Sequence, residues 1–300
     1  MASPPVEKAA DDGAWTVGKI IDWTTGHLKK HGSDTPRLEA EILLAHARNC
    51  PRIQLYVHYN EVLSEAERAT MRDLVKRRAQ AEPVAYLVGH REFFGLEFRV
   101  TPDVLVPRPE TETLVLELIA ASKASQRLRL LDLCTGSGCV AVAAAMNLPA
   151  ASLTATDISP PALAIARENA DRHGVSNRIR FLEGDLFAAV ADGEKFDVVA
   201  GNPPYVADAE METLPADVRQ HEPHLALRAG SQGLDVISRL IADAKQYLSP
   251  NGVLLIEFSP EQAAAVAELI ERTGAFEAPR LIKDASGRLR VLVAKLAPSR

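Results

Sequence analysis

The stretch Gly201-Asn202-Pro203-Pro204-Tyr205 follows an apolar run, residues 196–200, that is typical of a buried strand. Two prolines directly after a strand cannot continue it, because they lack amide donors and fix φ. The chain must therefore turn away at the carboxyl end of the strand, which is where open α/β sheets bind ligands. An amide, two rigid prolines and an aromatic ring together predict a clamp for a planar group bearing an NH2, either an amide or an exocyclic base amine. A Pro-Pro pair alone is equally compatible with an ordinary connecting loop that binds no ligand.

A second candidate cluster is the glycine-rich turn Cys134-Thr135-Gly136-Ser137-Gly138, between an apolar run that ends near Asp132 and a helical pattern that begins at Cys139. Glycines in such a turn let a ligand approach the backbone closely. Carboxylates end the next two expected strands. We expect Asp157 to accept the hydroxyl groups of a ribose and Asp185 to lie near an adenine.

The glycine-rich turn lacks the full Gly-x-Gly-x-x-Gly pattern, and the chain has no Gly-x4-Gly-Lys-Ser/Thr phosphate loop. These patterns serve cofactors that carry several phosphates, so their absence disfavours NAD and ATP. S-adenosylmethionine fits, because it carries an adenosine and no pyrophosphate. Asp132 is then expected near its ammonium group, although a structural carboxylate at a strand end is equally compatible with this position.

The elements that must position these residues alternate regularly from Leu128 onwards, with apolar runs separated by helical patterns. Such alternation predicts a doubly wound, mostly parallel sheet of the Rossmann-like type, which ends here in an antiparallel hairpin. The strands are expected at about 129–133, 152–156, 178–182, 196–200, 253–257, 276–283 and 288–296.

The first part of the chain has a different pattern. Residues 15–82 read as a small bundle of helices, in which Ser64-Glu65-Ala66-Glu67 is a capping box. Residues 93–100 and 104–106 alternate like a hairpin, with Gly95 and Pro102 as turn residues. We therefore expect four segments: a disordered leader (1–14), a helical recognition domain (15–85), a hairpin linker (86–113) and a cofactor-binding α/β domain (114–300).

Composition narrows the class of protein. The first 92 residues carry equal numbers of acidic and basic residues, so the whole net charge of −6 lies in the remainder. This balance disfavours a general nucleic-acid binder, which must neutralise phosphates. No apolar run approaches the roughly 20 residues that span a bilayer, and the start of the chain does not resemble a signal peptide. Three cysteines form neither a disulfide framework nor a zinc pattern, so we expect a cytoplasmic protein.

With these motifs the chain resembles one family, the protein-(glutamine-N5) methyltransferases of peptide chain release factors (the PrmC/HemK type). The resemblance covers nearly the whole chain from about residue 15. An Asn-Pro-Pro-Tyr motif alone is shared with adenine and rRNA methyltransferases, but its combination with Pro-Arg-Pro-Glu-Thr-Glu behind a helical domain is more specific. The matching stretches are Glu82–Leu87 with Gly89, Arg91–Phe93, Val106–Glu112, Asp132–Gly138, Gly201–Tyr205, Glu222-Pro223 and Ala226-Leu227.

The resemblance implies a class I S-adenosylmethionine-dependent fold and methylation of the glutamine in the Gly-Gly-Gln loop of class I release factors. It implies no metal, no membrane and no direct contact with nucleic acid. The implied catalytic residues are Asn202, Pro203 and Tyr205. The implied cofactor-binding residues are Asp132, Cys134, Thr135, Gly136, Ser137, Gly138, Asp157, Asp185, Leu186 and Asn202. The implied substrate-binding residues are Arg108, Asn202, Pro203, Pro204 and Tyr205.

The clamp then has a specific task. An amide nitrogen is a poor nucleophile, and it carries two hydrogens. The Asn202 side-chain carbonyl and the Pro203 backbone carbonyl can each accept a hydrogen bond from one of them. Holding both hydrogens orients the nitrogen towards the methyl group, and such positioning is worth up to roughly 7–11 kcal/mol in favourable cases. Tyr205 is expected to pack on the amide plane. No general base is required before methyl transfer.

Three departures from the family pattern are visible. Cys134 stands where many relatives have glycine, which we expect to be tolerated if that position needs no positive φ. Glu257-Phe258-Ser259 replaces a more usual acidic-apolar-glycine sequence. His221 precedes Glu222 as in enzymes that methylate a glutamine of a large-subunit ribosomal protein, so that activity stays open as an alternative. N6-adenine-type methylation of nucleic acid and a binding module without activity also stay open, whereas metal binding by His221 and His224 is disfavoured.

Overall fold

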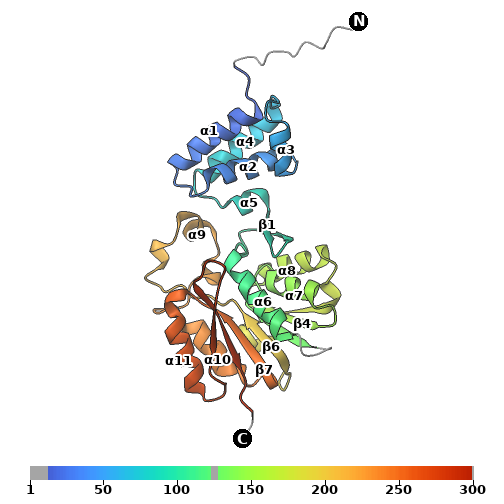
Figure 1. The fold of residues 1–300 in the computed structure, drawn as a ribbon, viewed down its shortest axis with the longest axis vertical. Coiled ribbons are helices and arrows are strands. Elements are labelled where there is room, and N and C mark those ends of the chain that lie inside the picture. Colours follow the sequence, from blue (N-terminus) through green and yellow to red (C-terminus); the bar gives the residue numbers. More distant parts are fainter. Residues whose placement is uncertain (1–12, 123–127, 299–300) are drawn as a thin grey trace. The chain divides into compact units, whose positions relative to one another are not determined.

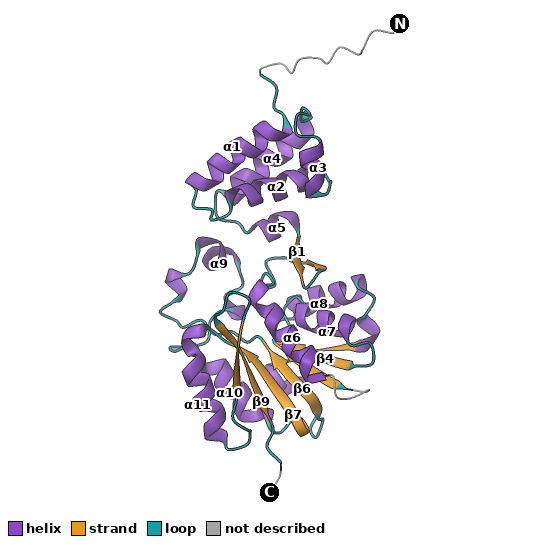
Figure 2. Cartoon of the chain, viewed as in Figure 1, coloured by secondary structure: helices purple, strands orange, loops and turns teal. Residues whose placement is uncertain are grey.

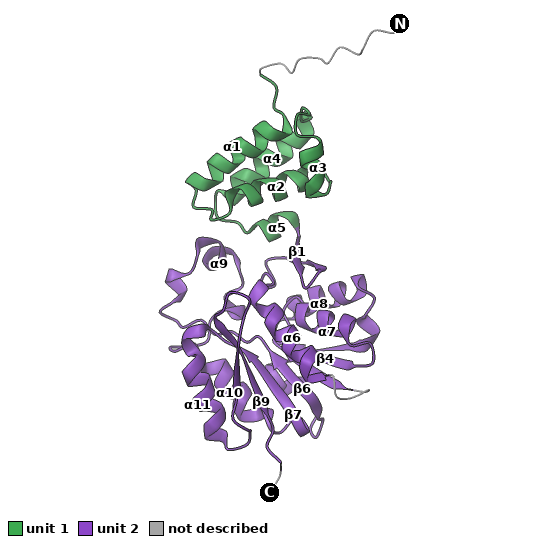
Figure 3. Cartoon of the chain, in the orientation of Figure 1, with its two compact units in different colours: residues 1–88 green, residues 89–300 purple. Residues whose placement is uncertain are grey.

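The computed structural model describes residues 13–122 and 128–298 of the 300-residue chain. The chain divides into two compact units, residues 1–88 and 89–300 (Figure 3), which we describe separately. Most of the leader predicted over residues 1–14 lies outside the described residues. Within the described part of the chain, no helix is long and apolar enough to cross a membrane.

The first unit is the helical bundle that the sequence predicts. The Thr16 hydroxyl accepts a hydrogen bond from the Lys19 amide at the start of the first helix, and Ser64 with Glu67 forms the predicted capping box. Buried aliphatic side chains from the helices form one core. A fifth short helix was not predicted. The helices are α1 Val17–Lys30, α2 Pro36–Ala47, α3 Arg52–Val57, α4 Glu65–Arg78 and α5 Val84–Val88.

The second unit is built on a seven-stranded sheet in the order β5-β4-β3-β6-β7-β9-β8, with antiparallel pairing only at β9 and β8 (Figures 1 and 2). Helices α6, α7 and α8 cover one face, and α10 and α11 cover the other. The strands are β3 Arg129–Leu133, β4 Ser152–Asp157, β5 Ile179–Glu183, β6 Phe196–Gly201, β7 Leu248–Glu257, β8 Arg280–Lys283 and β9 Leu289–Lys295. The helices are α6 Glu112–Ala121, α7 Cys139–Asn147, α8 Pro160–Arg172, α9 Ala216–His221, α10 Asp235–Ala244 and α11 Ala263–Thr273.

The register of the parallel strands brings the candidate residues to one edge. Leu133 at the end of β3 lies beside Thr156 of β4 on one side and Gly201 of β6 on the other. Gly201 in turn lies beside Ile256 of β7. The residues that follow these positions therefore gather at the carboxyl edge of the sheet, where neighbouring strands are about 4.8 Å apart.

The predicted hairpin forms in a different register. The strands are β1 His90–Phe93 and β2 Leu96–Arg99, joined through Phe94 and Gly95. Both turn residues have positive φ (54° and 71°), which suits a two-residue hairpin turn. The prediction that residues 104–106 form the second strand was wrong, because Gly95 closes the hairpin early. Residues 104–106 run instead to the carboxyl edge of the sheet.

A buried asparagine, Asn169 of α8, ties this hairpin to the glycine-rich turn. Its side chain is fully buried and makes three hydrogen bonds to backbone groups. Its carbonyl oxygen accepts from the Arg99 amide at 2.7 Å, and its NH2 donates to the carbonyl oxygens of Arg99 at 3.0 Å and Ser137 at 2.9 Å. A buried amide with its bonds satisfied fixes the geometry around it, because each partner is costly to leave unpaired.

Replacement of Asn169 by alanine is expected to lower the free energy of unfolding by about 2–4 kcal/mol, because three backbone groups lose their hydrogen-bond partner, one of them, the Ser137 carbonyl, in a fully buried bond. Chemical denaturation monitored by circular dichroism measures this change. Asn177→Ala, at an exposed position of the same unit, is the matched control and should stay within about 0.5 kcal/mol of the wild type. Equal stability of the two variants would contradict a central role for Asn169.

Candidate active site

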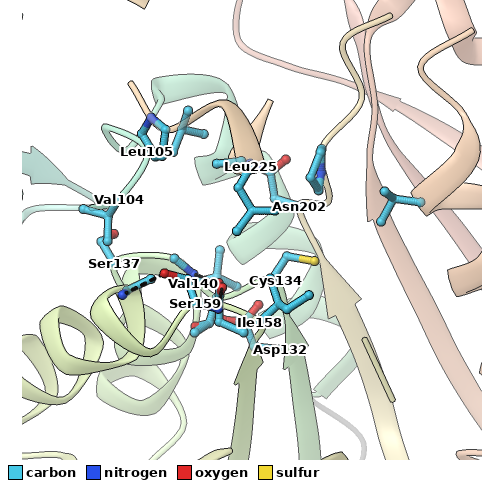
Figure 4. Close-up of a pocket in the computed structure, with 18 of the residues that line it drawn as sticks. Val104, Leu105, Asp132, Cys134, Ser137, Val140, Ile158, Ser159, Asn202 and Leu225 are labelled. Atoms are coloured by element: carbon cyan, nitrogen blue, oxygen red, sulfur yellow. Dashed lines mark hydrogen bonds between the residues drawn. The ribbon is translucent and has the colours of Figure 1, made fainter. Parts of the chain in front are cut away.

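A cavity opens at the carboxyl edge of the sheet, between the glycine-rich turn and the loop after β6 (Figure 4). The close-up shows Asp132 and Cys134 at the strand ends, with Asn202 and Leu225 on the other side of the opening. Gly138, Pro203 and Tyr205 do not line this cavity. The sequence-predicted residues that do line it are Arg108, Asp132, Cys134, Thr135, Gly136, Ser137, Asp157, Asp185, Leu186, Asn202 and Pro204.

The glycine-rich turn is held against the end of β4 by Asp157. One carboxylate oxygen accepts from the Gly136 amide at 2.8 Å and the other from the Ser159 amide at 2.9 Å. Burial raises the pKa of Asp157, and these backbone hydrogen bonds oppose the rise. Gly136 has φ of +54°, and a Cβ there would meet no atom within 4 Å, so the backbone faces open space. The turn can therefore receive a ligand against its main chain.

Gly138 has a structural role in this turn. It is the N-cap of α7, with φ of +79°, and a Cβ there would lie 3.0 Å from the Cβ of Ala166 in α8. Any other residue would both strain the backbone and push α7 away from α8. Gly138 therefore shapes the turn through the packing of the two helices.

Cys134 adopts a backbone conformation that favours glycine. Its φ is +57°, so the condition under which we expected a cysteine to be tolerated here, that the position needs no positive φ, is not met. Leu186, which follows the end of β5, also has positive φ (+53°). For residues other than glycine this conformation costs of order 1 kcal/mol or more. Both residues line the cavity, so these two strained positions belong to the site.

Asp132 is the most deeply buried carboxylate of the cavity. It is 3% exposed, and the Thr135 hydroxyl donates to it at 2.6 Å. Its pKa is raised to about 7, mainly by burial and also by the nearby Asp157, against the lowering effect of the Thr135 hydrogen bond. Asp185 is paired with Arg239 at 2.6 Å. With Asp103, four carboxylates line the cavity and outnumber the guanidinium groups of Arg108, Arg228 and Arg239, which favours a cationic ligand with hydroxyl donors over a polyphosphate.

On the opposite side, the Asn202 side chain is oriented by Thr111. Its Nδ2 donates to the Thr111 hydroxyl oxygen at 3.2 Å, which leaves its Oδ1 as the remaining acceptor. Thr111 is buried and also lines the cavity. The sequence pattern indicated Asn202 but not Thr111, which lies 91 residues earlier in the chain.

The loop after Asn202 is packed into the protein. Pro203 is buried, and the Tyr205 ring packs against two apolar clusters, one of which includes Val206 and Met211. Burial raises the pKa of the Tyr205 hydroxyl. The Tyr205 carbonyl accepts from the Gln262 side chain at 3.0 Å. The predicted stacking of Tyr205 on a substrate amide stays a prediction, and the structure gives the ring a packing role.

Arg108 lies at the rim of the cavity in an ion pair. Its guanidinium donates to Glu222 at 2.6 Å, and the same carboxylate also accepts from the Val106 amide at 3.3 Å. Glu222 is 5% exposed, so this pair fixes the segment before α6 against the segment after α9. The apolar wall residues Leu105 and Leu225 (Figure 4) belong to these two segments and carried no signal in the sequence.

The two histidines near Glu222, His221 and His224, lie outside the cavity. His221 ends α9, and an imidazole nitrogen of His224 lies 2.9 Å from the carbonyl oxygen of Arg219. Within residues 13–122 and 128–298, no group of three or more His, Cys, Asp or Glu side chains is placed to hold a metal ion.

Comparison with known proteins agrees with this architecture. Residues 19–89 match the family model of the PrmC N-terminal domain, and residues 110–221 match that of the methyltransferase small domain. The release factor glutamine methyltransferase of Rhodopirellula baltica is 45% identical over 289 residues, which cover 95% of this chain and 98% of the relative. That of Geobacter sulfurreducens is 44% identical over 260 residues, which cover 87% of this chain and 90% of the relative.

Among solved structures, the T. thermophilus 16S rRNA N2 G1207 methyltransferase, in complex with AdoMet and guanosine, aligns with a TM-score of 0.52. The two chains are 19% identical, and the alignment covers 69% of this chain and 50% of that one. Similarity at this level of identity shows the fold alone. Together with the family models, it confirms the predicted fold class.

The raised pKa of Asp132 predicts how stability depends on pH. The native state keeps the proton up to about pH 7, whereas the unfolded chain releases it near 3.8. The buried Asp132 therefore lowers the free energy of unfolding by an increasing amount as pH rises from about 4 to about 7. Asp132→Asn removes this cost. The free energy of unfolding of the variant minus that of the wild type should therefore be about 2–4 kcal/mol larger at about pH 8 than at about pH 4.

Chemical denaturation at several pH values measures this difference. Asp192→Asn, at an exposed position, is the control and should show no such trend. A difference that shrinks as pH rises would mean that the surroundings stabilise the Asp132 carboxylate rather than oppose it.

Proposed function

The chain belongs to the release factor glutamine methyltransferase family, and on this premise we propose that it methylates the side-chain amide nitrogen of the glutamine in the Gly-Gly-Gln motif of class I release factors. The methyl donor is S-adenosylmethionine. The observation that carries the proposal is the placement of Asn202 in the same cavity as the Gly136 turn and Asp157. A clamp for an NH2 group thus lies beside residues suited to the cofactor.

The residues of the cavity fit S-adenosylmethionine. When bound, this cofactor supplies an electrophilic methyl group on a positively charged sulfur. Asp157 would hold the ribose hydroxyls, because each of its oxygens retains a lone pair beside its backbone hydrogen bond. Asp132 would face the ammonium group, whose positive charge would favour the ionised carboxylate. Leu186 and Ile158, which line the cavity beside Asp185, offer apolar surface for an adenine.

On the substrate side, Asn202 and Pro203 would hold the glutamine amide. The Asn202 Oδ1 and the Pro203 carbonyl each accept one hydrogen of the substrate NH2, which directs the nitrogen lone pair towards the methyl group. These acceptors also stabilise the positive charge that develops on the nitrogen as the new bond forms. Pro203 and Pro204 keep the loop rigid, so the clamp needs no rearrangement before the reaction. The excess proton leaves the product afterwards to water.

The substrate is tested with S-adenosylmethionine labelled in its methyl group. The purified protein is incubated with a class I release factor, with the same factor carrying Asn in place of the motif glutamine, with large-subunit ribosomal proteins and with nucleic acid. Label in the unaltered release factor alone is the expected result. Label in ribosomal protein or nucleic acid, with none in the release factor, would overturn the proposal.

Asn202→Ala is expected to lower kcat by about 10²–10³-fold, because one acceptor of the clamp is lost in the transition state. The dissociation constant for S-adenosylmethionine, measured by calorimetry, should change by less than about threefold. Asn177→Ala is again the control and should retain full activity. A variant at Asn202 with near-normal turnover would show that the clamp is not the source of catalysis.

A further inference from the structure

Glu257, the last residue of β7, is a charged residue near the clamp that the proposed function leaves without a role. It is 1% exposed, and among the described residues neither of its carboxylate oxygens has a hydrogen-bond partner at bonding geometry. A buried carboxylate without partners is costly. Its position therefore requires an explanation beyond packing.

The strand register places Glu257 next to the clamp. Gly201, the last residue of β6, lies beside Ile256 of β7, so Asn202 directly after β6 and Glu257 at the end of β7 are the next residues along two adjacent strands. Side chains alternate along a strand, so Glu257 faces the same side as Leu255, which packs in the cluster that includes α6. Thr111 lies immediately before α6 and is 2% exposed.

Several groups from the surrounding elements face Glu257. Burial raises its pKa to about 7, and the Thr111 hydroxyl and Arg290 of β9 act against this rise. Glu110 raises the pKa and Arg108 lowers it, both from the segment before α6. The Tyr205 ring also lies close enough for the Glu257 charge to raise the pKa of its hydroxyl. Thr111 is thus a neighbouring hydroxyl that favours the ionised carboxylate, although the two side chains are not at bonding geometry in this structure.

The direction of hydrogen bonding follows from the donors available. An ionised carboxylate only accepts, and a threonine hydroxyl has one hydrogen to donate. If Thr111 donates this hydrogen to Glu257, its oxygen can serve Asn202 only as an acceptor. Asn202 must then turn its NH2 to Thr111, which is the bond observed at 3.2 Å. The Asn202 Oδ1 is consequently left for the substrate.

We propose that Glu257 is a positioning residue, whose carboxylate acts through the Thr111 hydroxyl to keep the oxygen of the Asn202 amide, rather than its NH2, directed at the substrate. This inference rests on the proposed function for its effect on turnover. With a neutral group at position 257, Thr111 is free to donate to the Asn202 Oδ1 instead. The Asn202 side-chain amide then rotates by half a turn. Its NH2 faces the NH2 of the substrate, and no hydrogen bond can form between the two.

Glu257→Gln tests the proposal, because glutamine keeps the shape of the side chain and removes its charge. We expect kcat to fall about 10–100-fold, with the dissociation constant for S-adenosylmethionine within about threefold of the wild type. Because Asn202 loses its orientation as Glu257 takes up a proton, wild-type kcat should decline as pH falls through about 7. In Glu257→Gln this decline should be absent. Glu268→Gln, at an exposed position on α11, is the matched control.

Thr111 provides an independent variant. Thr111→Val removes the hydroxyl at similar volume and should lower kcat as much as Glu257→Gln does, whereas Thr111→Ser should retain activity. Thermal unfolding at about pH 8 separates positioning from folding, since Glu257→Gln removes a buried charge and should not lower Tm. Wild-type kcat and an unchanged pH profile in both Glu257→Gln and Thr111→Val would overturn the proposal.

A readout without turnover distinguishes this inference from the proposed substrate. In ¹H–¹⁵N spectra of the labelled protein, the Asn202 side-chain amide, identified by its loss in Asn202→Ala, should shift with a midpoint near pH 7, the pKa of Glu257. The shift should vanish in Glu257→Gln. If the wild type shows this shift but labels no release factor, only the substrate assignment fails. If it labels the release factor without a Glu257-dependent shift, the positioning role fails.

Discussion

The constraint on which this site depends is the cost of holding carboxylates out of water at one edge of a parallel sheet. Asp157, Asp132 and Glu257 stand at the ends of three strands, and burial raises the pKa of all three. The three carboxylates differ in the hydrogen bonds that they accept from the protein. Asp157 accepts two backbone amides, Asp132 accepts the Thr135 hydroxyl with a further contribution from the Ala141 backbone, and Glu257 has no partner at bonding geometry among the described residues. A buried carboxylate that the fold itself leaves under-satisfied favours a positive ligand or a nearby donor.

The scaffold keeps these groups in place through polar side chains that bind main-chain groups of distant segments. Asn169 joins the hairpin to the glycine-rich turn, and Gln262 donates to the carbonyl oxygens of Tyr205 and Gly233 at 3.0 Å each. Such bonds fix loops that the sheet alone would leave mobile. The Thr156 hydroxyl donates in the same way to the carbonyl oxygen of Leu186 at 3.2 Å, which supports this residue in its left-handed conformation.

The sequence predicted what depends on local pattern. The parallel strands, the turn around Gly136, and the strand-end residues Asp157 and Asn202 follow from apolar periodicity and the position of glycines and prolines. The hairpin register was wrong because two turn signals, Gly95 and Pro102, compete and only the backbone decides between them. Thr111 and Glu257 were not recognised as a pair, since they lie far apart in the chain and their proximity comes from the pairing of β6 with β7 and the start of α6.

Packing alone cannot determine which end of the Asn202 side-chain amide faces the substrate. The oxygen and the NH2 of an amide have nearly the same shape, so an inverted side chain would fit the same space. The Pro203 carbonyl has no such ambiguity, because it can only accept. Positive charge develops on the substrate nitrogen during methyl transfer, so an acceptor there stabilises the transition state and a donor opposes it. A hydroxyl whose own direction is fixed by a buried charge can make this distinction, and the 3.2 Å bond from Asn202 to Thr111 has the direction that the reaction requires.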